Sequence, residues 1–234
     1  MISIDPLISL KNIRKVYKVG NEKVVALDCI NLDIEKGELC CILGTSGSGK
    51  STLLNLMAGL ERPTKGSIKI KGKPIERMGE NGLARFRRKN IGFVFQSYNL
   101  LPTLTAMENV SLPLTFRRMD KKLRDKKALE LLTQVGLESH ARHKPNQMSG
   151  GQQQRVGIAR AFIGNPEIVF ADELTGNLDS KTSEDIMNII TSIARENNQT
   201  LVIVTHDANI AKYGDKIVYF LDGNIEKIEN KQNV

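Results

Sequence analysis

Residues 39–60 read LCCILGTSGSGKSTLLNLMAGL, a short apolar run followed by a glycine-rich turn and a leucine-rich segment. Leu39–Leu43 has the length and composition of a buried strand, and Ser51–Ala58 carries apolar residues at helical spacing before Gly59, a residue type that often ends helices. The turn between them fits GxxxxGK[ST], in which backbone N–H groups converge on phosphate oxygens. We therefore expect a strand, a phosphate-binding loop and a helix in that order.

Two side chains of this stretch carry the chemistry of a nucleotide site. Lys50 is expected to reach the β- and γ-phosphates as a point charge, and the Ser51 hydroxyl to take one position on Mg²⁺. The start of the helix adds unpaired N–H groups and its positive dipole end. The alternative is a glycine loop that merely turns the chain, and the strand ahead and the helix behind favour nucleotide binding over it.

Composition bounds the class of protein. The chain has 234 residues, enough for one large α/β domain or two small ones. Its formal net charge of +8 suits polyanionic partners, but the basic residues are dispersed and no nucleic acid is expected. No apolar stretch approaches the ~18 residues that span a bilayer, and the first residues, MISIDPLISL, have neither a basic n-region nor a signal-type apolar core, so a cytosolic chain is expected. Three cysteines, Cys40 and Cys41 among them, lack metal or disulfide spacing and are expected to be small core residues.

The N-terminal part has the pattern of an antiparallel sheet. Apolar and polar residues alternate over Leu7–Ile13, Val24–Leu27 and Ile30–Ile34, which predicts short strands with one solvated face. Tyr17 lies between the first two strands. An isolated tyrosine in a strand usually packs, but a ring near a nucleotide site can stack on adenine, and both roles stay open.

Residues 97–164 have helical periodicity and few strand signals, which predicts an inserted helical subdomain. A helix is expected over Asp120–Val135, with one side formed by Ala128, Leu129, Leu131, Leu132 and Val135. Two prolines predict an irregular surface segment over Leu100–Leu114. The basic run Gly79–Asn90 is expected to be a solvated face. Near the C-terminus, Asp222-Gly223 between two apolar runs predicts a β-hairpin.

The stretch MSGGQQQ, residues 148–154, precedes an amphipathic helix. Ser149, Gly150 and Gly151 fall where that helix begins, and such a helix start is a second potential anion site. The alternative is plain N-capping by Ser149 with a flexible Gly-Gly entry. That alternative explains the serine but not two consecutive glycines, which are entropically costly.

Three apolar strand candidates end in polar side chains: Ile91–Phe95 before Gln96, Glu167–Ala171 before Asp172 and Glu173, and Leu201–Thr205 before His206. Parallel strands end on the same ligand-facing edge of a sheet, so these side chains are expected near the nucleotide. Asp172 would serve the Mg²⁺ shell and Glu173 would polarise an attacking water. The alternatives are a helix-start turn for the acidic pair and a structural role for the histidine. His140 and His143 lie in a polar loop and receive no role.

Taken together and in this order, the motifs resemble the ATPase subunits of ATP-binding cassette transporters across almost the whole chain. The resemblance implies that Tyr17 stacks on adenine, that Gly44–Ser51 is the Walker A loop, and that Gln96 joins the metal site to the membrane partner. It implies an α/β fold with a P-loop NTPase core, a mostly parallel sheet, an N-terminal antiparallel β subdomain and an inserted α-helical subdomain. The expected single domain has its core in residues 1–96 and 165–234 and its helical subdomain in residues 97–164.

The resemblance also assigns residue roles. Ser149-Gly150-Gly151-Gln152 matches the signature motif, Ile168–Asp172 the Walker B strand, Glu173 the catalytic carboxylate, Asp179 the loop aspartate and His206 the switch histidine. The implied catalytic residues are Glu173, His206, Lys50 and Gln96, and the implied metal ligands are Ser51, Gln96 and Asp172. The implied nucleotide contacts are Tyr17, Gly44, Thr45, Ser46, Gly47, Ser48, Gly49, Lys50, Ser51, Thr52, Gln96, Ser149, Gly150, Gly151, Gln152, Asp179 and His206.

In such proteins two copies bind ATP head to tail, and the resemblance implies the same here, with ATP and Mg²⁺ as cofactors. It further implies a separate membrane permease, possible help from an extracytoplasmic adaptor, and a cytoplasmic position on the inner face of the membrane. The stretches QSYNLLPTLTAMENVSLPL and MSGGQQQRVGIARA are most similar to the macrolide-export and lipoprotein-release branch. One departure is Leu174, where most members have proline, and we expect it to affect the stiffness of the following turn.

Two other functions stay open at this point. One is a soluble ATPase of the same family that acts on nucleic acid or ribosomes, which the basic charge permits. The other is a regulatory nucleotide-binding module that has lost hydrolysis, for which Leu174 is the only sign.

Overall fold

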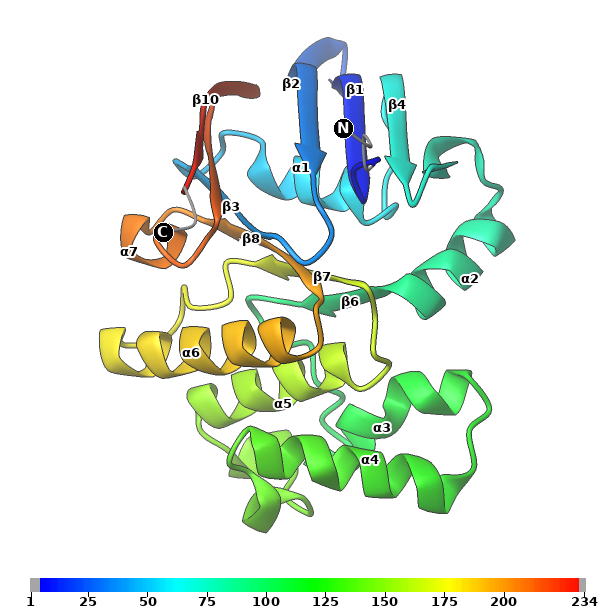
Figure 1. The fold of residues 1–234 in the computed structure, drawn as a ribbon, viewed down its shortest axis with the longest axis vertical. Coiled ribbons are helices and arrows are strands. Elements are labelled where there is room, and N and C mark those ends of the chain that lie inside the picture. The colour runs from blue at the N-terminus through cyan, green and yellow to red at the C-terminus, as the bar shows by residue number, and fades with distance from the viewer. Residues whose placement is uncertain (1–4, 232–234) are drawn as a thin grey trace. The chain divides into compact units, whose positions relative to one another are not determined.

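The computed structural model describes residues 5–231 and divides into two compact units. The first unit contains the residues up to Arg87 together with those from Thr200 onward, and the second unit is Arg88–Gln199 (Figure 1). Within the described residues no helix is long and apolar enough to cross a membrane. The boundaries expected for the helical subdomain remain a prediction.

The first unit contains the expected antiparallel sheet, with strand order β2-β1-β4-β5. The predicted strands Val24–Leu27 and Ile30–Ile34 are in fact one long strand. It is irregular at Cys29, which has a φ of 55°, and the register with β1 shifts nearby, so Leu27 and Ile30 are both buried. The strands are β1 (Ile8–Val19), β2 (Glu22–Ile34), β4 (Lys65–Ile70) and β5 (Lys73–Pro74).

A second group of strands in this unit has the order β10-β9-β3-β8. β3 is parallel to both of its neighbours, and β9 and β10 form the predicted hairpin, so the mostly parallel sheet and its hairpin are confirmed. The strands are β3 (Leu39–Gly44), β8 (Thr200–Thr205), β9 (Lys216–Leu221) and β10 (Asn224–Asn230). The helices are α1 (Lys50–Met57), the 3₁₀ turn η1 (Ile75–Arg77), α2 (Glu80–Asn90, which ends in the second unit) and α7 (Ala208–Ala211).

Two expectations for the first unit are only half right. Cys40 and Cys41 are fully buried in β3, and burial raises the pKa of Cys41 to about 12, but Cys29 is exposed and is not a core residue. The basic run Gly79–Asn90 has its exposed arginines on a helix whose other side is apolar. Leu83 is buried there and lies close to Gly59. Because the segment is helical from Glu80, its few apolar residues share one face, which the high density of charged residues in the sequence does not indicate.

The second unit contains the parallel pair β6 (Ile91–Val94) and β7 (Ile168–Asp172) and most of the helices. α3 packs on α4 and α5, and α5 packs on α6 (Figure 1). Leu129 is an exception to the predicted apolar side of α4, because its side chain is 39% exposed. The helices are α3 (Ala106–Phe116), α4 (Lys121–Gln134), α5 (Gly150–Phe162) and α6 (Ser180–Glu196), with 3₁₀ turns η2 (Glu138–His140) and η3 (Pro145–Gln147).

The prediction of an irregular segment over Leu100–Leu114 is wrong for its second half. Helix α3 begins after Thr105 and continues through Pro113. A capping box between Thr105 and Glu108 starts the helix, and burial of its apolar face offsets the backbone hydrogen bond that the proline removes.

Candidate functional site

The glycine-rich loop between β3 and α1 is shaped by close backbone approaches. A Cβ at Gly44 would lie 2.2 Å from the carbonyl oxygen of Phe220, and a Cβ at Gly49 would lie 2.6 Å from that of Ala26. Gly49 also has a φ of 102°, which L side chains rarely adopt. Gly47 differs, because it has a φ of 80° but no atom within 4 Å of its Cβ position. The loop is therefore held tightly at its ends and is open around Gly47.

Lys50 and Ser48 of the loop are held by contacts within the first unit. Lys50 is 4% exposed, and its Nζ donates to the carbonyl oxygen of Thr45 at 2.6 Å. The carbonyl oxygen of Ser48 accepts from the N–H of Gly223 at 2.8 Å. Gly223 belongs to the β9–β10 turn, so the C-terminal hairpin supports the loop. The sequence predicts this hairpin but not its place beside the loop.

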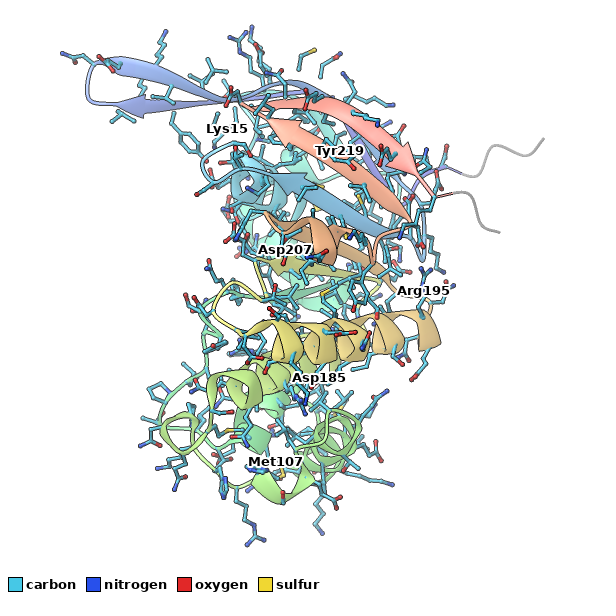
Figure 2. All side chains as sticks on the ribbon, turned by 90° about the vertical axis from the view of Figure 1, so that its left-hand side faces the viewer. Lys15, Met107, Asp185, Arg195, Asp207 and Tyr219 are labelled. Carbon is cyan, nitrogen blue, oxygen red and sulfur yellow. The ribbon has the colours of Figure 1, made fainter. Side chains whose placement is uncertain are left out.

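His206 leaves the same sheet edge as the glycine-rich loop. β3 and β8 are parallel, and Leu43 pairs with Thr205, so the next residues are Gly44 and His206. The side chain of His206 is exposed, and the following Asp207 caps α7 by accepting from the N–H of Asn209 at 2.7 Å (Figure 2). The register therefore brings together two of the predicted site features within the first unit.

Tyr17 is anchored by its hydroxyl group. The hydroxyl donates to Glu61 at 2.6 Å. The ammonium group of Lys15 lies 4.8 Å from the ring centroid and forms an ion pair with Glu61 at 3.0 Å (Figure 2 labels Lys15). Partial burial and the carboxylate of Glu61 raise the pKa of Tyr17. These contacts fix the orientation of the ring. The sequence pattern does not predict that Glu61 supports it.

In the second unit, Gln96 and the acidic pair lie at one edge of the β6–β7 pair. Val94 pairs with Ala171, which places Gln96 and Glu173 two residues beyond the same register point. A Cβ at Gly176 would lie 3.0 Å from Nε2 of Gln96, and Asn177 donates to the Gln96 carbonyl oxygen at 3.4 Å. The turn after the acidic pair therefore packs against the segment that carries Gln96.

Glu173 has a strained backbone. Its φ is 43°, a left-handed conformation that costs energy for a residue other than glycine and that concentrates at functional sites. Leu174, which follows, is buried at 2% exposure. A proline there would push position 173 toward extended backbone, so leucine is compatible with the conformation observed.

Asp179 is the N-cap of α6. It accepts hydrogen bonds from the N–H of Thr182 at 3.0 Å and from its hydroxyl at 2.6 Å, and these bonds lower the pKa of the carboxyl group. This capping is a structural role for a residue that the resemblance assigns to the nucleotide site. The exposed carboxylate still has lone pairs available.

The signature stretch begins α5 with a complete capping box. The hydroxyl of Ser149 accepts from the N–H of Gln152, whose side-chain oxygen accepts from the N–H of Ser149 at 2.8 Å. The amide nitrogen of Gln152 therefore faces His140, and the two side-chain nitrogens are 3.1 Å apart. Since the amide nitrogen only donates, Nε2 of His140 is the acceptor. The sequence gives His140 no role because the two residues are brought together by packing alone.

The two glycines of the signature stretch also have a packing reason. A Cβ at Gly150 would lie 2.8 Å from the hydroxyl oxygen of Tyr98, and one at Gly151 would lie 2.8 Å from Cγ2 of Thr182. N-capping by Ser149 alone does not explain the two consecutive glycines, and these close contacts within the chain explain them in part. Arg160 holds the adjoining loop by donating to the carbonyl oxygen of Tyr98 at 2.7 Å.

Comparison with known proteins identifies the family. A model of the ABC transporter family matches residues 27–176. An ABC transporter ATP-binding protein of Methanocaldococcus jannaschii, MJ0796, is 50% identical over 227 residues, which are 95% of this chain and 97% of that protein. The chain belongs to the ABC transporter family. It is an ATP-binding ABC ATPase, and the fold class inferred from the resemblance is confirmed.

Other relatives refine the place of this ABC ATPase. The macrolide export ATP-binding/permease protein MacB of Pasteurella multocida is 45% identical over 220 residues, 94% of this chain but 34% of that protein. A solved dimeric structure of MJ0796 matches with a TM-score of 0.91 at 48% identity, covering 97% of this chain and 100% of that one. These matches agree with the macrolide-export and lipoprotein-release branch, and they do not favour a nucleic-acid or ribosome ATPase.

Proposed function

We propose that this ABC ATPase hydrolyses ATP with Mg²⁺ at a site completed by a second copy, and that it powers a separate membrane permease from the cytoplasmic face. The observation that carries the proposal is the glycine-rich loop, whose ends exclude any Cβ while its middle is open. A solved structure of MJ0796 with a TM-score of 0.90 is described as a dimeric post-hydrolysis state bound to ADP and Pi, which supports ATP hydrolysis at a site that a second copy completes.

In the first unit, the loop and α1 bind the phosphates. The N–H groups of the loop contact phosphate oxygens, Lys50 contacts the β- and γ-phosphates, and Tyr17 stacks on the adenine. His206 contacts the γ-phosphate from the neighbouring strand end. Because Glu61 accepts from both the Tyr17 hydroxyl and the side-chain amide of Asn55 in α1, the base and phosphate contacts are held as one set.

In the second unit, Glu173 orients or deprotonates the attacking water, and Asp179 and Gln96 contact the nucleotide or its water shell. Gln96 and Asp172 of this unit offer an amide oxygen and a carboxylate, and Ser51 of the first unit offers a hydroxyl; each is a hard oxygen donor of the kind that Mg²⁺ prefers. Within residues 5–231 no group of three His, Cys, Asp or Glu side chains could hold a metal, and Mg²⁺ needs only one or two carboxylates beside phosphate and water. When bound, Mg²⁺ neutralises charge on the transferred phosphoryl group.

The signature stretch supplies the contact to the second copy. Its capping box uses the N–H groups of Ser149 and Gln152 and not those of Gly150 and Gly151. The start of α5 therefore offers backbone donors and a positive dipole end to the γ-phosphate bound by the partner. Since ATP supplies that phosphate and ADP does not, ATP favours the closed dimer and hydrolysis releases it.

A cavity in the second unit is the proposed permease contact. It has a volume of about 310 Å³ and combines the apolar side chains of Leu112, Pro113 and Phe116 with Arg88 and Arg117. Apolar walls with cationic edges suit a short amphipathic segment that carries acidic residues. The cavity lies on the same unit as Gln96, the residue that joins the metal site to the membrane partner in the family resemblance.

Replacement of the proposed catalytic carboxylate tests the proposal. Glu173→Gln removes the base while keeping the size of the side chain, so ATP binding should persist while kcat falls at least a hundredfold. The ATP-bound variant should elute as a dimer and the ADP-bound variant as a monomer in light scattering. Glu184→Gln, an exposed residue of α6, removes the same charge and should change neither property. Near wild-type turnover in Glu173→Gln would refute the assignment, and equal mass with both nucleotides would refute the shared site.

A further inference from the structure

A basic surface is formed by residues at the end of α3, in the following loop and in the first turns of α4; Figure 1 shows where these two helices lie. Residues 116–127 hold seven basic and two acidic side chains, so the positive charge of the chain is more concentrated than its overall pattern indicates. Two large apolar side chains, Phe116 and Leu123, are 62% and 47% exposed among them. We define the α4 basic surface as these two residues with the exposed cations Arg118, Lys121, Lys122, Lys126 and Lys127.

The five cations of this surface are available for a partner, whereas the other two basic residues of this stretch, Arg117 and Arg124, have structural contacts. Within residues 5–231 none of the five forms an ion pair shorter than 4.0 Å. Arg117 instead donates to the carbonyl oxygens of Gly164 and Arg88, and burial lowers its pKa. Arg124 is half-buried and lies 4.0 Å from Asp125. Lys121 lies near the carboxylate of Glu108 but outside ion-pair distance, so most of the positive charge of the five exposed side chains is uncompensated.

Their placement works against the stability of α4. Lys121 and Lys122 are in the first turn, which contains no acidic residue, and the positive end of the helix dipole disfavours cations there. Lys122 and Lys126 are four residues apart and repel each other. The N-cap Asp120, which accepts from two N–H groups, and Asp125, four residues after Lys121, offset only part of this. An anionic partner bound to the surface would relieve both unfavourable interactions.

The mixture of charge and exposed apolar groups selects the kind of anion. Lysines beside an exposed phenylalanine and leucine are typical of surfaces that lie in the headgroup region of a membrane. Phe116 belongs both to this surface and to the wall of the proposed permease cavity, so the surface continues from that contact. We propose that the α4 basic surface binds the anionic phospholipid headgroups around the permease, an inference that depends on the membrane position in the proposed function.

Vesicle binding by the full chain tests this. The protein is mixed with phosphatidylcholine vesicles that contain no or roughly 30% phosphatidylserine, and the bound fraction is measured by sedimentation at about 0.1 M and 0.5 M salt. The test variant replaces Lys121, Lys122, Lys126 and Lys127 with Gln. The matched control replaces Lys65, Lys69, Lys71 and Lys73, exposed lysines of the first unit, with Gln and loses the same charge.

Each lysine near an anionic surface contributes roughly fivefold to partitioning, so the test variant should bind phosphatidylserine vesicles at least fiftyfold more weakly. The control variant should lose less than threefold, and high salt should abolish the difference. Leu123→Ser should weaken binding about two- to fivefold because it removes the inserted apolar group. The thermal midpoint of the test variant should equal or exceed that of wild type, which excludes unfolding as the cause. Equal losses in both lysine variants, or no preference for phosphatidylserine, would overturn the proposal.

Two further measurements distinguish lipid binding from nucleic-acid binding and from the proposed ATPase function. A fluorescent DNA duplex should bind the test and control variants equally, and loss of DNA binding in the test variant with unchanged vesicle binding would assign the surface to nucleic acid instead. ATP turnover in detergent-free buffer should be the same in both variants, because neither changes the nucleotide site. If the wild-type protein does not hydrolyse ATP at all, that result counts against the proposed function and not against lipid binding.

Discussion

Two helices of this ABC ATPase begin beside glycines, but their first turns are satisfied in opposite ways. α1 begins after Gly49, which has a φ of 102° and offers no side-chain cap. α5 begins after Ser149, which forms a reciprocal capping box with Gln152. The start of α1 therefore leaves its capping position to a ligand, whereas the start of α5 is already ordered by its own residues.

This difference indicates different tasks. A loop without a side-chain cap suits a site that wraps around a phosphate within one chain, because the ligand supplies the missing acceptor. A helix start fixed by Ser149, Gln152 and His140 suits a rigid surface that meets a phosphate delivered by another molecule. Variants that disturb one helix start and not the other test this division, and the largest effect is expected at the glycine-rich loop.

Gly49→Ala should abolish ATP binding and lower the free energy of unfolding by about 3 kcal/mol or more. The added Cβ meets a backbone oxygen 2.6 Å away at a φ of 102°, and a left-handed conformation alone costs roughly 1–2 kcal/mol. Gly47→Ala is the matched control, because its Cβ meets nothing within 4 Å and only the backbone cost applies. Denaturant unfolding without nucleotide measures both, and equal losses would show that the close approach at Gly49 is not what shapes the loop.

Ser149→Ala should have the second largest effect, on turnover more than on stability. Losing the N-cap costs about 1 kcal/mol of stability, and losing a hydroxyl contact to the partner's phosphate should reduce kcat roughly ten- to hundredfold. The affinity of the monomer for ATP should not change, because the residue contacts only the second copy's nucleotide in the proposed dimer. Steady-state hydrolysis and nucleotide titration of the same sample separate these quantities.

Thr105→Ala is the control for this effect. Thr105 forms the same kind of capping box with Glu108 at the start of α3, so the stability loss should be similar. Its turnover should stay within about twofold of wild type, since this cap has no proposed phosphate contact. A comparable fall in turnover for both variants would mean that the Ser149 cap acts through folding stability alone.

The sequence predicts the parts of this molecule that depend on neighbouring residues. The P-loop, the strand that precedes it and the β9–β10 hairpin follow from local turn chemistry and periodicity, and the structure contains all three. The strand-end positions of Gln96 and His206 follow from the geometry of parallel sheets. Local patterns suffice because glycine, apolar runs and alternation constrain the backbone directly.

The remaining features depend on contacts between distant residues. Pro113 lies inside α3 because burial of that helix outweighs a lost hydrogen bond, which no local propensity shows. Gly223 supports Ser48, and His140 accepts from Gln152, only because folding brings these pairs together. Cys29 is exposed because a strand irregularity changes the side-chain alternation. A single sequence does not show which distant residues contact each other. It therefore predicts the chemical groups of the site but not the residues that hold those groups in place.

Gly151→Ala should have the smallest effect and is the sharpest test of the signature glycine. The new Cβ lies 2.8 Å from Cγ2 of Thr182, so crowding costs about 1–2 kcal/mol, while the better helix propensity of alanine returns up to about 1 kcal/mol. Adding Thr182→Ser removes that methyl group and keeps the hydroxyl that donates to Asp179. The double variant should therefore regain wild-type stability in thermal unfolding, with Thr182→Ser alone as the control.

Turnover of this double variant decides why position 151 is glycine. If the start of α5 receives a phosphate from the partner, a Cβ still hinders that approach, and kcat should stay about five- to tenfold low although stability is restored. Recovery of turnover together with stability would mean that Thr182 alone requires the glycine. The contrast between α1 and α5 would then depend on Ser149 and the Gly150 position, and the donors that α5 offers to a second copy would be fewer than proposed.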